Sequence, residues 1–178
     1  MTAQIPDRIH YRRKSYDLIG VAGTGLPEPG KIGLLPQASG TANYRGFIRF
    51  FTIRRGQLWL DQISITQPAW HVPEASEKSP GLGEQKQISQ LTMTVDFTGT
   101  LRIAREFIDR YYVHMGFQKA SAFGVVLDLT FMSGRVCEVT DRSAYFATKR
   151  GSFKQYFAAE NDVQAKIEAA FSLDLDIE

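Results

Sequence analysis

Two segments of the chain share one residue pattern, and this pattern constrains the fold more than any other feature. Residues 46–60 and residues 124–138 each begin with a glycine, have a threonine six positions later and a second glycine four positions after the threonine. Apolar residues flank the second glycine, as in a strand, a tight turn and a returning strand. We therefore expect repeated antiparallel hairpins over 44–65 and 123–139, each with a three-residue turn. Since only three of the fifteen aligned positions are identical, duplication and convergence on one turn chemistry both remain open.

The N-terminal residues predict another hairpin. Ile9 and Tyr11 precede a run of three basic residues, and Tyr16 and Leu18 follow it. Pairing Tyr11 with Tyr16 also pairs Ile9 with Leu18. This pairing places all four apolar side chains on one face of the hairpin, as a half-buried sheet requires.

The clearest alternation of apolar and polar residues lies between residues 91 and 103. Its apolar positions are Leu91, Met93, Val95 and Phe97. A strand with one buried face has this pattern. A three-residue turn at residues 98–100 would pair Phe97 with Leu101. It would also place Asp96 opposite Arg102, which is a favourable cross-strand pair.

Two long connections and a C-terminal helix complete the expected elements. Residues 23–43 and 67–87 contain many prolines and glycines, which interrupt both helices and strands. Residues 104–112 fit either a short helix or a strand. Asn161 can cap a helix, and apolar residues follow it at helical spacing: Val163, Ile167, Ala170 and Phe171. We expect the acidic residues 174–178 to fray or to form an edge strand.

These elements predict an α+β fold that is mostly β. The antiparallel hairpins form a barrel or a two-layer sandwich, and the C-terminal helix packs on it or beside it. A chain of 178 residues is typical of a single domain and buries about 70% of its unfolded surface on folding. An aromatic content of 12% suits a core built from strands.

Charge and cysteine usage bear on location and partners. The formal net charge of +2 does not by itself indicate a nucleic-acid partner. The single cysteine, Cys137, cannot form an internal disulfide, and residues 1–14 lack the apolar stretch of a signal peptide. No apolar run reaches the roughly 20 residues of a membrane helix. We expect a cytoplasmic protein that does not associate with a membrane.

The sequence predicts neither a cofactor nor a metal. Residues 20–25 have the spacing G-x-x-G-x-G, but they run into Pro27 and Pro29 and not into the helix that a phosphate-binding loop requires. The soft metal ligands of the chain are His10, His71, His114 and Cys137. No two of them have the short spacing that is typical of a zinc site.

His114 is the one weak catalytic candidate. Aromatic residues and a glycine flank it, and an orienting carboxylate would allow it to act as a general base. A ligand-binding groove would combine His114 with Tyr44, Arg45 and Trp59. The structural interpretation of the same residues is a half-buried histidine and aromatic side chains packed in the core.

Basic residues gather at the expected turns, in residues 12–14, 54–55 and 149–150. Turns that share one edge of the fold would form a patch for phosphate or for an acidic partner. Solvated hairpin tips explain the same pattern. Nucleic acid is the less favoured partner, and it would require an affinity that falls steeply with salt.

Several motifs together resemble a family of small bacterial proteins with no assigned activity. Residues 43–48 contain an aromatic-Arg-Gly-aromatic motif, residues 51–60 continue into Leu-Trp-Leu, and residues 112–117 read Tyr-Val-His-Met-Gly-Phe. Residues 97–103 and 127–136 extend the resemblance, and residues 104–110 depart from it. The resemblance implies a bacterial cytoplasmic protein and transfers no catalytic residue. Small proteins of this kind can lie beside toxin or secretion genes, so it also implies an immunity-like role by analogy.

Our functional prediction is a non-catalytic binding or accessory protein that engages another protein. No nucleophile–base pair, metal spacing or cofactor loop stands out in the sequence. Exposed sheet edges would also be compatible with a homodimer. The alternative is a small-molecule-binding protein or an enzyme with a pocket around His114.

Overall fold

The computed structural model describes residues 2–68, 84–150 and 170–175. Its strands are β1 (Arg8–Tyr11), β2 (Lys14–Thr24), β3 (Phe47–Arg54), β4 (Gln57–Gln67), β5 (Glu84–Thr94), β6 (Thr98–Phe107), β7 (Phe123–Met132) and β8 (Arg135–Asp141). Its helical elements are short: η1 (Pro29–Ile32), η3 (Asp109–Tyr111), η4 (Ala120–Ala122) and α1 (Ser143–Thr148). The mostly-β α+β fold is confirmed.

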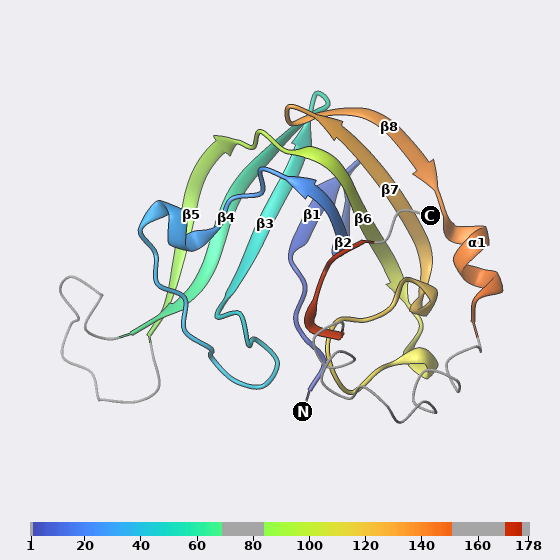
Figure 1. The fold of residues 1–178 in the computed structure, drawn as a ribbon, viewed down its shortest axis with the longest axis horizontal. Coiled ribbons are helices and arrows are strands. Elements are labelled where there is room, and N and C mark those ends of the chain that lie inside the picture. The colour runs from blue at the N-terminus through green and yellow to red at the C-terminus, as the bar shows by residue number, and fades with distance from the viewer. Residues whose placement is uncertain (1, 69–83, 151–169, 176–178) are drawn as a thin grey trace.

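All eight strands belong to one curved sheet in the order β3-β1-β2-β6-β7-β8-β4-β5, and β3 also pairs with β4. The β1–β3 pair is parallel, and the other neighbours in the described sheet are antiparallel. Strand β8 reaches β4 through a single residue pair, Gln57 and Arg135. Figure 1 shows two arms, one with β3, β4 and β5 and the other with β6, β7 and β8, which meet at their hairpin tips. The arrangement is sandwich-like.

The two hairpins of the repeated pattern close with two-residue turns, so the expected three-residue turns are wrong. The turn of β3–β4 is Arg55-Gly56, and the turn of β7–β8 is Ser133-Gly134. The φ angles are 50° and 77° in the first turn and 46° and 75° in the second. Both are therefore type I′ turns, whose backbone twist matches that of the paired strands.

The β1–β2 hairpin also has a two-residue turn, Arg12-Arg13, and Ile9 pairs with Tyr16. The expected pairing of Tyr11 with Tyr16 is wrong by two residues. A shift of two positions leaves every side chain on its original face. Ile9, Tyr11 and Tyr16 are accordingly buried, as the alternation predicts.

The hairpin expected over residues 91–103 is wrong, because β5 pairs with β4, and β6 pairs with β2 and β7. Gly99 lies inside β6 opposite Gly23 of β2. A Cβ atom added to Gly99 would lie 2.1 Å from the carbonyl oxygen of Ala22. The glycine permits close approach of two strands, where the sequence pattern indicated a turn.

Arg102 faces β7 in the sheet. It is the register partner of Asp128, not of Asp96 as expected. The ion pair is therefore formed with a different aspartate, since the strand order brings β6 against β7.

One apolar cluster holds the arms of the sheet together. Its largest fully buried members include Phe97, Phe131, Leu58, Leu101 and Leu129. The rings of Phe97 and Phe131 meet edge to face, with their centroids 5.8 Å apart. Burial of each such side chain stabilises the fold by about 1.5–3 kcal/mol. The core thus joins strands that are distant in sequence.

The connections differ in part from expectation. Strand β2 continues to Thr24, and η1 interrupts the long connection over residues 23–43. Gln67 belongs to β4 and residues 84–87 belong to β5, while residues 69–83 lie outside the described part of the chain. Residues 104–107 extend β6 and are followed by η3, so the ambiguous segment is part strand and part short helix.

The expected C-terminal helix lies largely outside the described residues, within which Ala170 and Phe171 are helical. Helix α1 precedes it and is held against β7, where the N–H of Val126 donates to Oγ of Ser143 (3.0 Å). Near the C-terminus, Val21 of β2 forms an isolated parallel bridge with Asp174.

Candidate functional site

Hairpin tips gather at one end of the molecule. The tips of β3–β4 and β7–β8 lie side by side at the top of Figure 1. The N–H of Leu58 donates to the carbonyl oxygen of Gly134 (2.8 Å), and the N–H of Val136 donates to that of Gly56 (2.8 Å). These residues occupy equivalent positions in the two matching segments, so the bonds are exchanged with local pseudo-twofold symmetry. The repeated sequence pattern therefore marks the joint where the sheet returns to itself.

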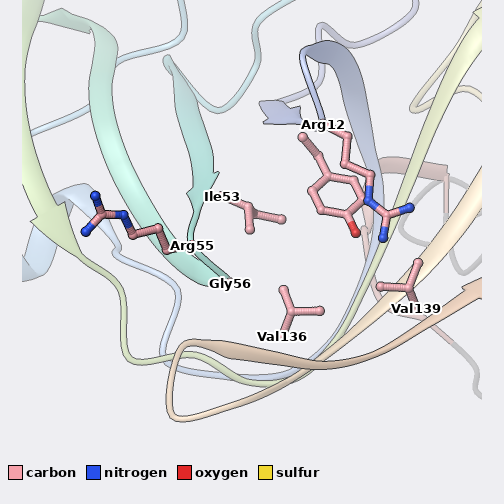
Figure 2. Close-up of a pocket in the computed structure, with 7 residues that line it drawn as sticks. Arg12, Ile53, Arg55, Gly56, Val136 and Val139 are labelled. Carbon is pink, nitrogen blue, oxygen red and sulfur yellow. The ribbon is translucent and has the colours of Figure 1, made fainter.

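A pocket of about 440 Å³ lies beside this joint. The residues that line it come from three hairpins: Tyr11, Arg12, Ile53, Arg55, Gly56, Val136 and Val139. Figure 2 shows Ile53 and Val136 across the hollow from each other and the guanidinium of Arg12 near Val139. Arg55 stands at the opposite side, with its guanidinium directed away. The pocket thus combines apolar walls with a cationic border at Arg12, and Arg55 adds a further charge outside it.

A β-bulge creates the apolar wall on β8. Phe131 pairs with Val136, and Leu129 pairs with Val139, because the register shifts by one residue between these pairs. Phe131 and Leu129 are core residues, so Val136 and Val139 share the core-facing side although they are three positions apart. Val139 is nevertheless 37% exposed. It is an apolar side chain at the open end of the core.

Cys137 is the extra residue of this bulge, and it is exposed. Its thiol donates to the carbonyl oxygen of Thr130 (3.3 Å). Its place on a strand, where a hydrophobic residue is usual, favours an inert buried thiol, and this interpretation is wrong because the bulge removes the position from the regular alternation of the strand.

Arginines occupy turn positions that strongly favour asparagine or glycine. The φ angles are 48° at Arg12, 63° at Arg13 and 50° at Arg55, all in the left-handed region. A residue with a Cβ atom is strained there by about 1 kcal/mol or more. Type I′ turns are usually Asn-Gly for this reason. The chain places cations at these tips despite the strain.

We call the exposed cationic residues at these tips the basic rim: Arg12, Arg13, Lys14, Arg55 and Arg135. Within the described residues, no salt bridge involves any of them. The adjacent Arg54 is excluded from the rim because its guanidinium pairs with Asp61 (2.7 Å). An uncompensated cluster of this kind attracts acidic groups.

The third expected basic turn does not join the rim. Arg150 donates to the carbonyl oxygens of Phe123 (2.7 Å) and Ser121 (3.2 Å). Phe123 begins β7 and Ser121 lies in η4 just before it, while the rim surrounds the tip that follows the end of β7. The structure therefore gathers residues 12–14 and Arg55 and separates residues 149–150 from them.

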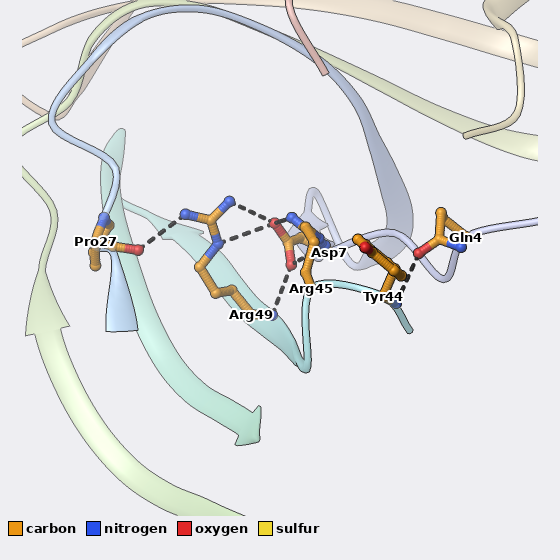
Figure 3. A network of polar contacts seen from close by, with 6 residues as sticks. All are labelled: Gln4, Asp7, Pro27, Tyr44, Arg45 and Arg49. Atoms are coloured by element: carbon orange, nitrogen blue, oxygen red, sulfur yellow. Dashed lines mark hydrogen bonds and ion pairs between the residues drawn. The ribbon is translucent and has the colours of Figure 1, made fainter. Parts of the chain in front are cut away.

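Arg45, a predicted ligand-binding residue, belongs to a buried ion cluster with Asp7 and Arg49, which we call the Asp7 cluster (Figure 3). The Asp7 carboxylate accepts two hydrogen bonds from Arg45 (3.0 and 3.2 Å). It also accepts bonds from Nε (3.0 Å), Nη2 (2.7 Å) and the backbone N–H (2.8 Å) of Arg49. Nη1 of Arg49 donates to the carbonyl oxygen of Pro27 (2.9 Å). Both carboxylate oxygens of Asp7 therefore accept hydrogen bonds from arginines.

The Asp7 cluster has a structural role. Burial of Asp7 would by itself raise the pKa of its carboxyl, but the charges of Arg49 and Arg45 and the hydrogen bonds from Arg49 outweigh burial and lower that pKa. Asp7 directly precedes β1, which is parallel to β3 over only three residue pairs. The cluster clamps this short seam. An arginine inside the apolar run of β3 was the sequence signal for a buried acidic partner, and we did not predict it.

The other predicted site residues lie apart from the pocket. Tyr44 is exposed, with its ring edge-on to Phe171 (6.0 Å between centroids), and its N–H donates to Oε1 of Gln4 (2.9 Å; Figure 3). Trp59 lies on β4 beneath the guanidinium of Arg54, 5.9 Å from the ring centroid. His114 is exposed and stacks edge-on against Tyr112. None of the four predicted residues lines the pocket.

Across the described ranges, no group of three or more His, Cys, Asp or Glu side chains is placed to hold a metal ion. No helix in that part of the chain has both the length and the apolar character needed to cross a membrane. Comparisons with protein-family models, with curated proteins and with solved structures found no match. The rim and its pocket are therefore interpreted from their own chemistry.

Proposed function

We propose that this protein is a non-catalytic binding protein that engages another protein through the basic rim. The observation that carries the proposal is the presence of Arg12 and Arg55 at strained turn positions beside one largely apolar pocket, with the strained Arg13 next to Arg12. Strain that the fold does not need is typical of functional positions. Arginine beside a partly apolar hollow is also a common composition for the centre of a protein interface.

Among the described carboxylates with a shifted pKa, Asp7 is the fully buried one, and its surroundings support a binding role over catalysis. A lowered pKa in a cleft can indicate a catalytic group, but structural ion pairs cause the same shift. Asp7 is fully buried, and its oxygens are bonded to Arg45 and Arg49. Its shifted pKa is explained by the clamp between β1 and β3.

The proposal also assigns the protein to the bacterial cytoplasm, with an immunity-like role as its biological setting. The motifs around residues 43–60 and 112–117 support this assignment through the family resemblance. An exposed, unpaired Cys137 is compatible with a reducing compartment.

Affinity purification of the tagged chain from its native cell tests the proposal. The variant Arg12→Asn/Arg13→Gly removes two rim charges and relieves the turn. The control Lys31→Gln/Arg110→Gln removes two exposed charges from η1 and η3. We expect one stoichiometric protein that is retained by the wild type and the control and is lost with the rim variant. Equal capture by all three chains, or capture of no protein, would overturn the proposal.

A further inference from the structure

Building on this proposed function, we infer that the partner presents an extended acidic segment that adds as a strand to the free edge of β8. The segment would place one apolar side chain in the rim pocket. This mode of recognition obtains affinity from main-chain hydrogen bonds and specificity from the pockets beside the edge. Three independent features of the structure support it: the edge, the pocket and the charge.

Strand β8 has an open edge. It pairs with β7 over its whole length, and among the described strands it meets β4 only at Gln57–Arg135. The N–H of Val136 donates to the carbonyl oxygen of Gly56, so the main-chain groups of Val136 point away from β7, toward the open side. The N–H of Arg142 donates to Val126 of β7. The N–H and C=O groups of successive residues point alternately to the two sides of a strand. Arg142 points toward β7, so Val139, which is three positions earlier, points to the open side.

The pocket lies beside that same edge. Val139 and Val136 of β8 form one wall, and Ile53 of β3 contributes to the opposite side (Figure 2). The side chains of an added strand would alternate between the two faces of the sheet, so residues two positions apart would share a face. One apolar residue of the segment would fill the hollow above the exposed face of Val139. The remaining residues would stay near solvent.

The charge around the pocket selects an acidic segment. Arg12 and Arg55 line the pocket, and Arg135 begins β8. Two carboxylates occur further along β8. Asp141 accepts the N–H of Ser143 (2.8 Å), and Glu138 accepts the hydroxyl of Thr140 (3.2 Å). The positive charge therefore lies at the hairpin-tip end of the β8 edge, beside the pocket. The acidic residues of the segment would bind at this end.

A protein segment fits this site better than a nucleic acid does. Single-stranded nucleic acids bind to exposed aromatic rings on which bases stack. The pocket contains one aromatic residue, Tyr11, which is buried and covered by the guanidinium of Arg12, 5.1 Å from the ring centroid. The available contacts are aliphatic side chains and main-chain groups. These contacts suit an extended peptide.

Selection from a displayed library of random peptides tests the inference without knowledge of the partner. The peptides have seven residues, the length of β8, and the full chain is the target. We expect enrichment of sequences in which Asp or Glu alternates with Val, Ile or Leu and in which proline is absent. Enrichment of basic or proline-rich peptides, or no enrichment at all, would overturn the inference.

A selected peptide then distinguishes charge from strand addition. Binding should weaken by about tenfold or more in Arg12→Asn/Arg13→Gly, while the melting temperature of that variant rises by about 2–4 °C because the turn strain is relieved. Amide exchange at Val139 should slow when the peptide is added. Exchange along β5, the other open edge of the described sheet, should not change. Unchanged affinity in the variant, or protection of β5 alone, would contradict the assigned site.

Two further outcomes identify a different occupant and overturn the inference. Protection of Val139 that depends on protein concentration, without peptide, would indicate a second copy of the chain. Binding of a single-stranded oligonucleotide in place of peptides would indicate nucleic acid. If the affinity purification yields a rim-dependent partner and the library yields no peptide, the inference fails while the proposed function stands. If the purification yields no partner but rim-dependent acidic peptides bind at β8, the strand-addition site stands without the cellular role.

Discussion

The Asp7 cluster and a second cluster around Asp128 contain the same groups, one carboxylate and two guanidiniums, in different surroundings. Asp128 accepts hydrogen bonds from Nε (2.7 Å) and Nη2 (2.8 Å) of Arg102 and from Nε of Arg142 (3.1 Å). Arg102 and Asp128 are opposite each other on strands that pair in any case. The Asp128 cluster therefore reinforces an existing ladder.

The Asp7 cluster instead joins segments that are not held by a long strand ladder, next to the hydrogen bonds that link Gln4 to Thr41 and Tyr44. Asp7 is 38 residues from Arg45 and 42 residues from Arg49 along the chain, and it takes the backbone N–H of Arg49 where the parallel β1–β3 pairing is short. The side chain of Arg49 is 7% exposed, whereas that of Arg142 is 38% exposed. If the carboxylate is lost, water can therefore hydrogen-bond to Arg142 but not to Arg49. We therefore expect the burial of a charge cluster, and the segments that it joins, to determine its contribution to stability more than its composition does.

The largest expected difference is between the variants Asp7→Asn and Asp128→Asn. Loss of the Asp7 charge leaves buried guanidiniums without a counter-ion and should lower the free energy of unfolding by about 3–5 kcal/mol. The Asp128 variant should lose about 1–2 kcal/mol, since Arg142 can turn to water. Urea unfolding of both variants measures the difference. Equal losses would remove the distinction between the two clusters.

The pH dependence of stability isolates the Asp7 contribution. Its pKa in the folded chain is lowered below the ordinary value of 3.8. The unfolded chain therefore takes up this proton first on acidification, and stability falls with falling pH. We expect the difference in unfolding free energy between wild type and Asp7→Asn to be constant from pH 7 to about pH 5 and to shrink below that.

Unfolding curves at a series of pH values, measured for both chains in the same salt, test this expectation. The difference between the two chains cancels the titration of all other groups that the substitution leaves unchanged. A difference that grows on acidification would mean that the Asp7 pKa is raised by burial, and the clamp would then have to be abandoned.

The sequence predicts which side chains are buried better than it predicts which strands pair. Alternation correctly placed Ile9, Tyr11 and Tyr16 in the core, because strand faces survive a register error of two residues. The register itself was wrong because Arg12-Arg13 carries none of the usual signals of a type I′ turn. Gly99 appeared to be a turn residue, because its true partner on β2 is distant in sequence.

The site was predictable only in its local parts. The basic residues at 12–14 and 54–55 were expected at turns, and the structure brings Arg12 and Arg55 to one pocket. That proximity depends on the strand order, which no local pattern specifies. Arg45 lies between aromatic residues in the sequence, but its partner Asp7 is separated from it by the β1–β2 hairpin and the long connection that follows. Long-range pairing of this kind leaves no periodic signal in a single sequence.

A smaller contrast is expected when one arginine is removed from each cluster. Arg49→Met leaves the buried Asp7 with fewer charged hydrogen bonds, and we expect a loss of about 1.5–3 kcal/mol. Arg142→Met removes a partly exposed partner from Asp128, and we expect a loss of about 0–1 kcal/mol. Methionine retains the aliphatic length in both variants. Thermal unfolding at low and at high salt should show that only the Arg142 contribution is screened.

The smallest effect concerns Asp17, a carboxylate beside the same seam for which the described residues supply a single charged partner. It pairs with Arg8 (2.9 Å), whose side chain is about half exposed. Burial raises the pKa of Asp17 by more than the charge of Arg8 lowers it, so that pKa is raised.

The ionised carboxylate of Asp17 is thus less favourable in the folded chain than in the unfolded chain at pH 7, and this cost disappears as the pH falls through the raised pKa. Asp17→Asn should therefore be neutral or stabilising by about 0.5 kcal/mol or less at pH 7, with any gain vanishing in acid. Urea unfolding at pH 7 and in acid measures this, and a loss above about 1 kcal/mol at pH 7 would show that the pair with Arg8 supports the seam as the Asp7 cluster does.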